Sequence, residues 1–144
     1  MPITDPTQEY FKDGAWGWNG TTWVKLPLVF GYYEQYLEQV TNLNASTGDN
    51  WLNGSVVPAG EIWVVTAATA SNEDAACARI QMFIYDGAKH YAMGSVTNPV
   101  ADQSLVFAGQ VILNPGNRFV VRMRGVTAGN DLYFDINGYK MKVT

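Results

Sequence analysis

The chain has 144 residues, with nine Lys and Arg against 13 Asp and Glu, and with one cysteine and one histidine. This length suits one compact domain that folds without disulfides, and Cys77 and His90 alone exclude a Cys/His metal cluster. The net charge of −4 disfavours nucleic-acid binding. The sequence contains neither a long apolar run nor a basic leader, so we predict no membrane partner and no Sec-type signal.

Residues 1–31 are predicted to form an N-terminal arm. The segment is rich in aromatic residues, Gly and Pro, and no helical or strand period runs through it before Trp23. Its rings need a surface that buries them, which is either the core of the same subunit or another chain. We interpret the segment as an arm whose interface anchors are Tyr10, Phe11, Trp16, Trp18 and Trp23.

Residues 32–144 are predicted to form a β-sandwich domain. The first part, 33–40, fits helical spacing, but Glu34 and Glu38 would place like charges four residues apart on a helix. We therefore expect a strand there. Residues 44–50 form a turn by composition, and 51–57 are expected to return as a short strand.

The clearest strand signals lie after residue 61. Residues 62–70 are almost continuously apolar, which is typical of a strand covered on both sides. Alternating apolar residues predict further strands at 77–85, 118–124 and 132–136, and a second apolar run predicts one at 105–113, followed by turn residues at 114–117. The inward sets of the last two are Phe119, Val121 and Met123, and Leu132, Phe134 and Ile136.

Two details concern the last strands. The apolar parity shifts by one residue at Asn137-Gly138, which predicts a β-bulge, with a two-residue hairpin as the alternative. If 118–124 pairs with 131–136 as a hairpin, Arg124 lies opposite Asp131 and Arg122 lies diagonal to Asp135. Short strands separated by regular turns predict an all-β fold, an antiparallel β-sandwich.

The sequence predicts no catalytic residues and no cofactor. His90 is the single histidine and lies in an expected hairpin, and Cys77 begins an apolar strand, which is typical of a buried thiol. Acidic pairs at 73–74 and at 131 and 135 are expected to be solvated or paired with arginines. The 44–50 loop offers few carboxylates beyond Asp49, so we predict no metal site.

Five tryptophans are the richest chemical resource of the chain. They could stack on sugar rings, as in a carbohydrate-binding module. We favour a structural role, in which Trp51 and Trp63 are core residues and Trp16, Trp18 and Trp23 anchor the arm.

Several phrases resemble small structural proteins of tailed bacteriophages. They are VPAGEIWVVT at 57–66, FAGQVILNPG at 107–116, TAGNDL at 127–132, INGY at 136–139 and GWNGTTWVKL at 17–26. The resemblance implies a jelly-roll-like sandwich that decorates the outer capsid surface as a non-enzymatic cement protein. It also implies synthesis in the host cytoplasm, a homotrimer, and the major capsid protein as partner. The alternative is a tail or fibre component that binds host surface glycan. The resemblance assigns no catalytic residues.

Overall fold

The computed structural model describes residues 16–18, 20–25 and 29–143. Within them the chain forms ten β-strands and no helix. The described residues therefore contain no helix of the length and apolar character that crosses a membrane. The strands are β1 (Trp16–Trp18), β2 (Trp23–Lys25), β3 (Val29–Asn42), β4 (Gly48–Asn53), β5 (Glu61–Asn72), β6 (Arg79–Tyr85), β7 (His90–Thr97), β8 (Leu105–Leu113), β9 (Arg118–Val126) and β10 (Leu132–Val143).

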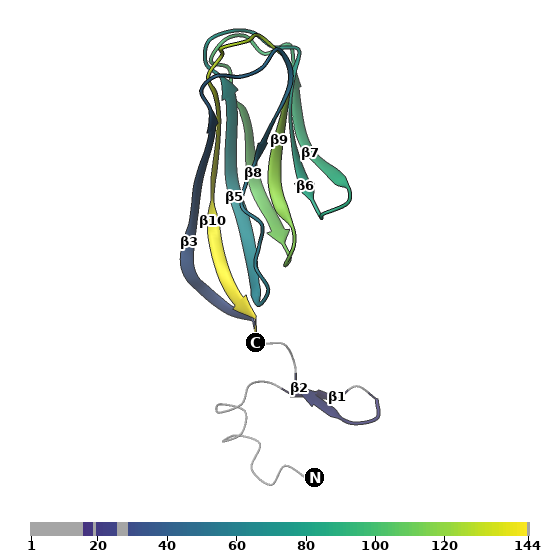
Figure 1. The fold of residues 1–144 in the computed structure, drawn as a ribbon. Helices are drawn as coiled ribbons and strands as arrows, with labels where there is room; N and C mark the ends of the chain where they lie inside the picture. Colours follow the sequence, from purple (N-terminus) through teal and green to yellow (C-terminus); the bar gives the residue numbers. More distant parts are fainter. Residues whose placement is uncertain (1–15, 19, 26–28, 144) are drawn as a thin grey trace.

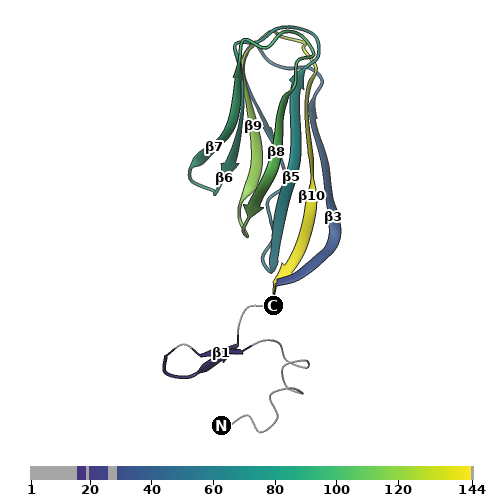
Figure 2. The same ribbon diagram turned by 180° about the vertical axis from the view of Figure 1, so that it is seen from behind.

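The body is a sandwich of two four-stranded antiparallel sheets, shown from opposite sides in Figures 1 and 2. One sheet has the order β3-β10-β5-β8 and the other has the order β4-β9-β6-β7. From β3 onward every connection crosses between the sheets except the β6–β7 hairpin. This is the strand order of an eight-stranded jelly roll. The predicted all-β antiparallel sandwich is confirmed.

A short hairpin precedes the body. Strands β1 and β2 pair antiparallel, with Trp16 opposite Lys25 and Trp18 opposite Trp23. The sequence pattern before Trp23 does not reveal the first of these strands. Gly20 adopts φ +98°, a conformation open to glycine, and lets the chain reverse there. Three-residue strands are too short to show a period in the sequence.

The core lies between the two sheets. Its buried side chains include all of those predicted to face inward on the last strands. Phe119 of β9 and Phe134 of β10 come from opposite sheets, and their ring centroids lie 5.9 Å apart. The adjacent residues Val64 and Val65 of β5 are both buried, which confirms that this part of β5 is covered on both sides.

The predicted irregularity at Asn137-Gly138 is a register shift inside a continuous strand. Against β5, Asn137 lies opposite Ala67 and Gly138 lies opposite Val65, so Thr66 is the extra residue. The hydroxyl of Thr66 donates a hydrogen bond to the carbonyl oxygen of Asn137 at 3.2 Å. A bulge is therefore present beside Asn137-Gly138, but its extra residue belongs to β5, and β10 stays in unbroken register with β3 there. The predicted parity shift along the last strand is wrong, and so is the alternative hairpin.

The predicted pairing of β9 with β10 is wrong. The connection between them crosses from one sheet to the other, so β9 pairs with β4 and β6, while β10 pairs with β3 and β5. Arg122 instead donates to Asp49, which lies on β4. Asp135 accepts a hydrogen bond from the Gln39 amide at 2.7 Å. Partners that belong to opposite sheets cannot form cross-strand pairs.

A buried tyrosine links β3 to the segment that follows β4. The Tyr36 side chain is 2% exposed, and its hydroxyl donates to the Glu38 carboxylate at 2.7 Å. The backbone N–H and the hydroxyl of Ser55 donate to the same carboxylate at 2.8 to 3.1 Å. Burial, followed by the hydrogen bond to Glu38, raises the pKa of Tyr36 far above its usual range.

This raised pKa predicts a loss of stability at alkaline pH. Above pH 10.0, the ordinary pKa of tyrosine, the unfolded chain releases the Tyr36 proton while the folded chain keeps it. The free energy of unfolding should then fall by about 1.4 kcal/mol per pH unit from this group. Tyr36→Phe lacks the titrating hydroxyl and should not show this decline. The difference in free energy of unfolding between the original chain and the variant, measured in urea titrations, should therefore shrink by about 2 to 3 kcal/mol between pH 9 and pH 12. Parallel pH profiles would contradict the assignment.

Candidate binding surface

All four arginines of the chain lie on the outer face of the β4-β9-β6-β7 sheet. Arg118, Arg122 and Arg124 alternate along β9 with the buried Phe119, Val121 and Met123. Arg79 begins β6 and lies directly opposite Arg124. Because alternate residues of a strand share one face, the four guanidinium groups emerge on the side away from the core.

Aromatic side chains lie between these arginines. They are Trp51 of β4, Phe83 and Tyr85 of β6, and His90 of β7. The His90 ring stacks on Tyr85 at 4.5 Å and meets Trp51 at 4.7 Å between centroids. Phe83 lies 5.8 Å from Trp51. Val120 belongs to the same outer face, opposite Phe83, yet it is 0% exposed, which indicates that the rings cover it.

Two arginines lie over these rings. The guanidinium carbon of Arg118 is 4.9 Å from the centroid of the Tyr85 ring, and that of Arg122 is 5.3 Å from the Trp51 ring. Such cation–π contacts hold a guanidinium flat against a ring and restrict its rotamers. We refer to these four arginines and four rings together as the arginine face.

The positive charge of the arginine face is only partly neutralised. Asp49 pairs with Arg122 and lies 3.8 Å from the Arg124 guanidinium. Among the described residues no carboxylate forms an ion pair with Arg79 or Arg118, and the Nε atom of each is buried without a hydrogen-bond partner. Arg79 donates one hydrogen bond to the Ser95 hydroxyl at 3.2 Å. The surface therefore combines guanidinium groups that have no carboxylate partner with an aromatic floor, which suits an anionic ligand that also offers apolar contacts.

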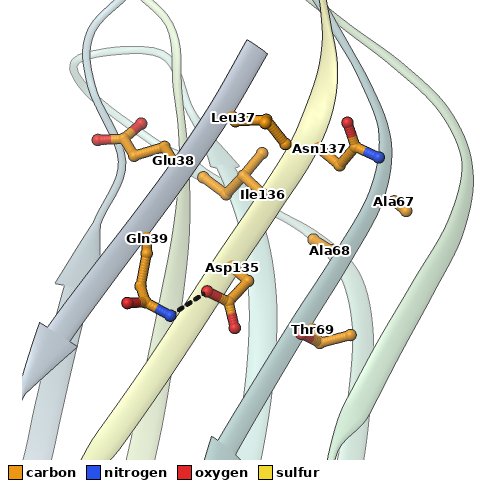
Figure 3. A pocket seen from close by; sticks show the side chains of 9 residues that line it. All are labelled: Leu37, Glu38, Gln39, Ala67, Ala68, Thr69, Asp135, Ile136 and Asn137. Atoms are coloured by element: carbon orange, nitrogen blue, oxygen red, sulfur yellow. Dashed lines mark hydrogen bonds between the residues drawn. The ribbon is translucent and has the colours of Figure 1, made fainter. Parts of the chain in front are cut away.

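A groove of about 370 Å³ lies on the outer face of the other sheet (Figure 3). Leu37 and Gln39 of β3, Asp135 and Asn137 of β10, and Thr69 of β5 line it. Cross-strand register puts Asp135 between Gln39 and Thr69. The Asp135 carboxylate already accepts the Gln39 amide, so the charge that it brings to this groove is partly satisfied.

The structure describes part of the predicted arm. Tyr10 and Phe11 lie outside the described residues. Trp16 and Trp23 belong to the β1–β2 hairpin, and the Trp18 side chain in the same hairpin is 58% exposed. The interface role of these five residues stays a prediction.

Trp51 and Trp63 are both predicted from the sequence to be core residues, and the prediction is confirmed for Trp63 and wrong for Trp51. Trp63 is 6% exposed, and its indole N–H donates to Glu61 at 2.5 Å, which lowers the pKa of that carboxyl group. Trp51 is 38% exposed and lies on the arginine face. Its neighbour Leu52 is the residue that points into the core, at 3% exposure.

The residues considered for catalysis are not brought together. Cys77 is buried, and burial raises the pKa of its thiol, which keeps it protonated. His90 is exposed on the arginine face, and its described ring contacts are aromatic. Asp74 accepts the backbone N–H of Asp131 at 2.6 Å and so fixes a loop.

The loop at 44–50 is held by its own side chains. The Asn50 amide oxygen accepts the Ser46 N–H at 3.2 Å, and its amide nitrogen donates to the Ser46 carbonyl at 2.7 Å. Asp49, the carboxylate considered for calcium, is the partner of Arg122. No group of three potential metal ligands occurs within the described part of the chain.

Sequence reasoning misses the arginine face, although part of its signal is visible. The alternation along the strands places Arg118, Arg122 and Arg124 outward, and it does the same for Arg79. What the sequence does not supply is the pairing of β6 with β9, which are separated by two other strands along the chain.

Comparisons with known proteins place the chain in no family. No protein-family model matches it, and no curated protein is significantly similar in sequence. Among solved structures, a GH26-CBM35 β-(1,4)-mannanase of Podospora anserina is similar at 12% identity and a TM-score of 0.33. The aligned region spans 82% of this chain but 28% of the mannanase chain. A similarity this low supports no conclusion about function.

Proposed function

We propose that this chain is a non-enzymatic structural protein of a tailed-phage virion. In this role it is a homotrimeric decoration subunit on the outer capsid surface that binds the major capsid protein and neighbouring copies. The phage-like phrases support this role, and so does the jelly-roll strand order, which the resemblance implies.

The exposed indole of the N-terminal hairpin is the observation that carries the proposal. Trp18 is 58% exposed ahead of a body whose core is already complete between two sheets. Burying a large aromatic side chain contributes about 1.5 to 3 kcal/mol, so such a ring is well suited to anchor the hairpin on another chain. Val29 of β3 pairs with Val143 of β10, so the hairpin leads into the end of the body where the last strand finishes.

Deleting residues 1–22 tests this role. The body begins at β3, so the truncated chain should keep its cooperative thermal unfolding. It should no longer form trimers in light scattering and should no longer co-sediment with undecorated capsids, because four of the five predicted anchors are removed and only Trp23 remains. Trp51→Ala, which changes an indole of the body instead, is the matched control and should retain both properties. A truncated chain that still assembles and binds capsids would refute the role of the arm.

One observation favours a second candidate, a tail or fibre component that binds host surface glycan. Trp51 lies on an outer face beside His90 and Arg122 rather than in the core. Aromatic rings with nearby polar groups are suited to contact sugar rings. A chain that forms oligomers but never binds capsids would favour this candidate over the decoration role.

A further inference from the structure

We propose that the arginine face binds an acidic polysaccharide, one that carries carboxylate or sulfate groups at intervals along a chain of sugar rings. The inference rests on the second candidate function, glycan recognition, and names its ligand class. It does not depend on whether the body is attached to a head or a tail.

The distribution of charge is the first argument. The face holds all four arginines and one carboxylate, Asp49, while the other charged residues of the chain are five lysines and twelve carboxylates. An acidic polymer is thus repelled by most of the protein and attracted by this one sheet. Such an electrostatic field orients the approaching polymer toward the arginine face and also strengthens its binding there.

The length of the face is the second argument. Arg118 and Arg124 are six residues apart on β9, which corresponds to about 20 Å at the rise of an extended strand. Arg118 lies near one end and the opposed pair Arg79 and Arg124 lies near the other. One small anion cannot span that distance, whereas a polymer with repeated anionic groups reaches both ends.

The density of free charge separates a glycan from a nucleic acid. Arg79 and Arg118 lack a carboxylate partner among the described residues, and they lie toward opposite ends of the face. A DNA duplex carries about one negative charge per 1.7 Å, which far exceeds what two separated guanidinium groups neutralise on an acidic protein. Sparse charges on a sugar polymer match this spacing better. The Trp51 and His90 rings of the same face offer apolar contact to the sugar rings that carry these charges.

The face also bears a cost that a purely structural sheet would avoid. Arg79 and Arg124 occupy directly opposite positions on neighbouring strands, where like charges destabilise a sheet. The Nε atoms of Arg79 and Arg118 are buried without partners, which is a further penalty. An anionic ligand that binds between Arg79 and Arg124 relieves the repulsion of the opposed pair.

The test measures calorimetric binding of hyaluronate fragments, which carry regularly spaced carboxylates, against dextran fragments of equal size. The full chain should bind hyaluronate, with affinity that falls as salt rises, and should bind dextran at least tenfold more weakly (roughly tenfold per charge-assisted contact). The double variant Arg79→Gln/Arg118→Gln should lose hyaluronate binding by about a hundredfold on the same scale.

The matched control is Lys140→Gln/Lys142→Gln, which removes the same charge from the other sheet and should bind hyaluronate as the original chain does. Thermal melting establishes that both double variants fold. Equal hyaluronate binding by both double variants would overturn the proposal. Dextran binding as tight as hyaluronate binding would also overturn it, but would leave the more general role in glycan recognition intact. Tighter binding of single-stranded DNA would overturn it in favour of nucleic acid. A change of oligomer mass confined to the arginine variant would overturn it in favour of an interface between copies.

Discussion

Gly138→Ala is expected to destabilise the sandwich by about 3 kcal/mol or more, or to prevent folding. Gly138 lies in β10, the strand paired on both sides within its sheet, at the point where the register with β5 shifts. A β-carbon there would lie 1.8 Å from the carbonyl oxygen of Val64 and 3.0 Å from the Cα of Val65. Both obstacles are backbone atoms, so relief requires the β5–β10 pairing to separate.

Gly94→Ala is the matched control for this substitution. Gly94 lies in β7, and the nearest atom to an added β-carbon is the Leu105 methyl group at 4.0 Å, an ordinary contact. We expect a change within about 1 kcal/mol, because alanine mainly restricts the unfolded chain. Urea titrations of both variants give the comparison. Equal free energies of unfolding for Gly138→Ala and Gly94→Ala would mean that the backbone at the Thr66 bulge can shift at little cost, which would contradict this prediction.

The strands themselves are largely predictable because their cause is local. Alternation of apolar residues along 118–124 reflects which side chains face the core, and Phe119, Val121 and Met123 are all 0% exposed. The strand expected at 105–113 has the bounds observed for β8. Period-two patterns arise wherever one face of a strand is buried, whatever its neighbour is.

The pairing of strands is harder to predict because it depends on distant parts of the chain. The loop after β9 has the length and composition of a hairpin, although it carries the chain to the other sheet. Consequently Arg122 finds Asp49, which lies 73 residues away, rather than a carboxylate on the next strand. Short-range charge patterns fit either topology, so they cannot decide between them.

Trp51 shows why the candidate site is only partly predictable. Trp51 and Leu52 are adjacent apolar residues, and in a strand they must face opposite sides. Hydrophobicity alone favours burying the larger one. The structure buries Leu52 because β4 is in register with β9, where Leu52 lies opposite the core residue Val121 and Trp51 lies opposite Arg122. The arginine face thus depends on register, which no single segment encodes.

Phe119→Ala is expected to lower the free energy of unfolding by about 3 to 5 kcal/mol. The Phe119 ring is 0% exposed and lies between Phe107 and Phe134, with centroid distances of 5.8 and 5.9 Å. These neighbours belong to β8 and β10 of the opposite sheet, so truncation leaves a cavity between the two layers that rigid strands cannot close.

Phe83→Ala removes the same ring from the outer face of the same sheet. Phe83 is half-buried, and solvent can reorganise over the gap, so the loss should be about half as large. Urea titrations of both variants test the difference. Phe119 packs between the two sheets, whereas Phe83 packs on the outer face against Trp51 and His90. A Phe83 variant that proves the less stable would contradict the assignment of the main core to the space between the sheets.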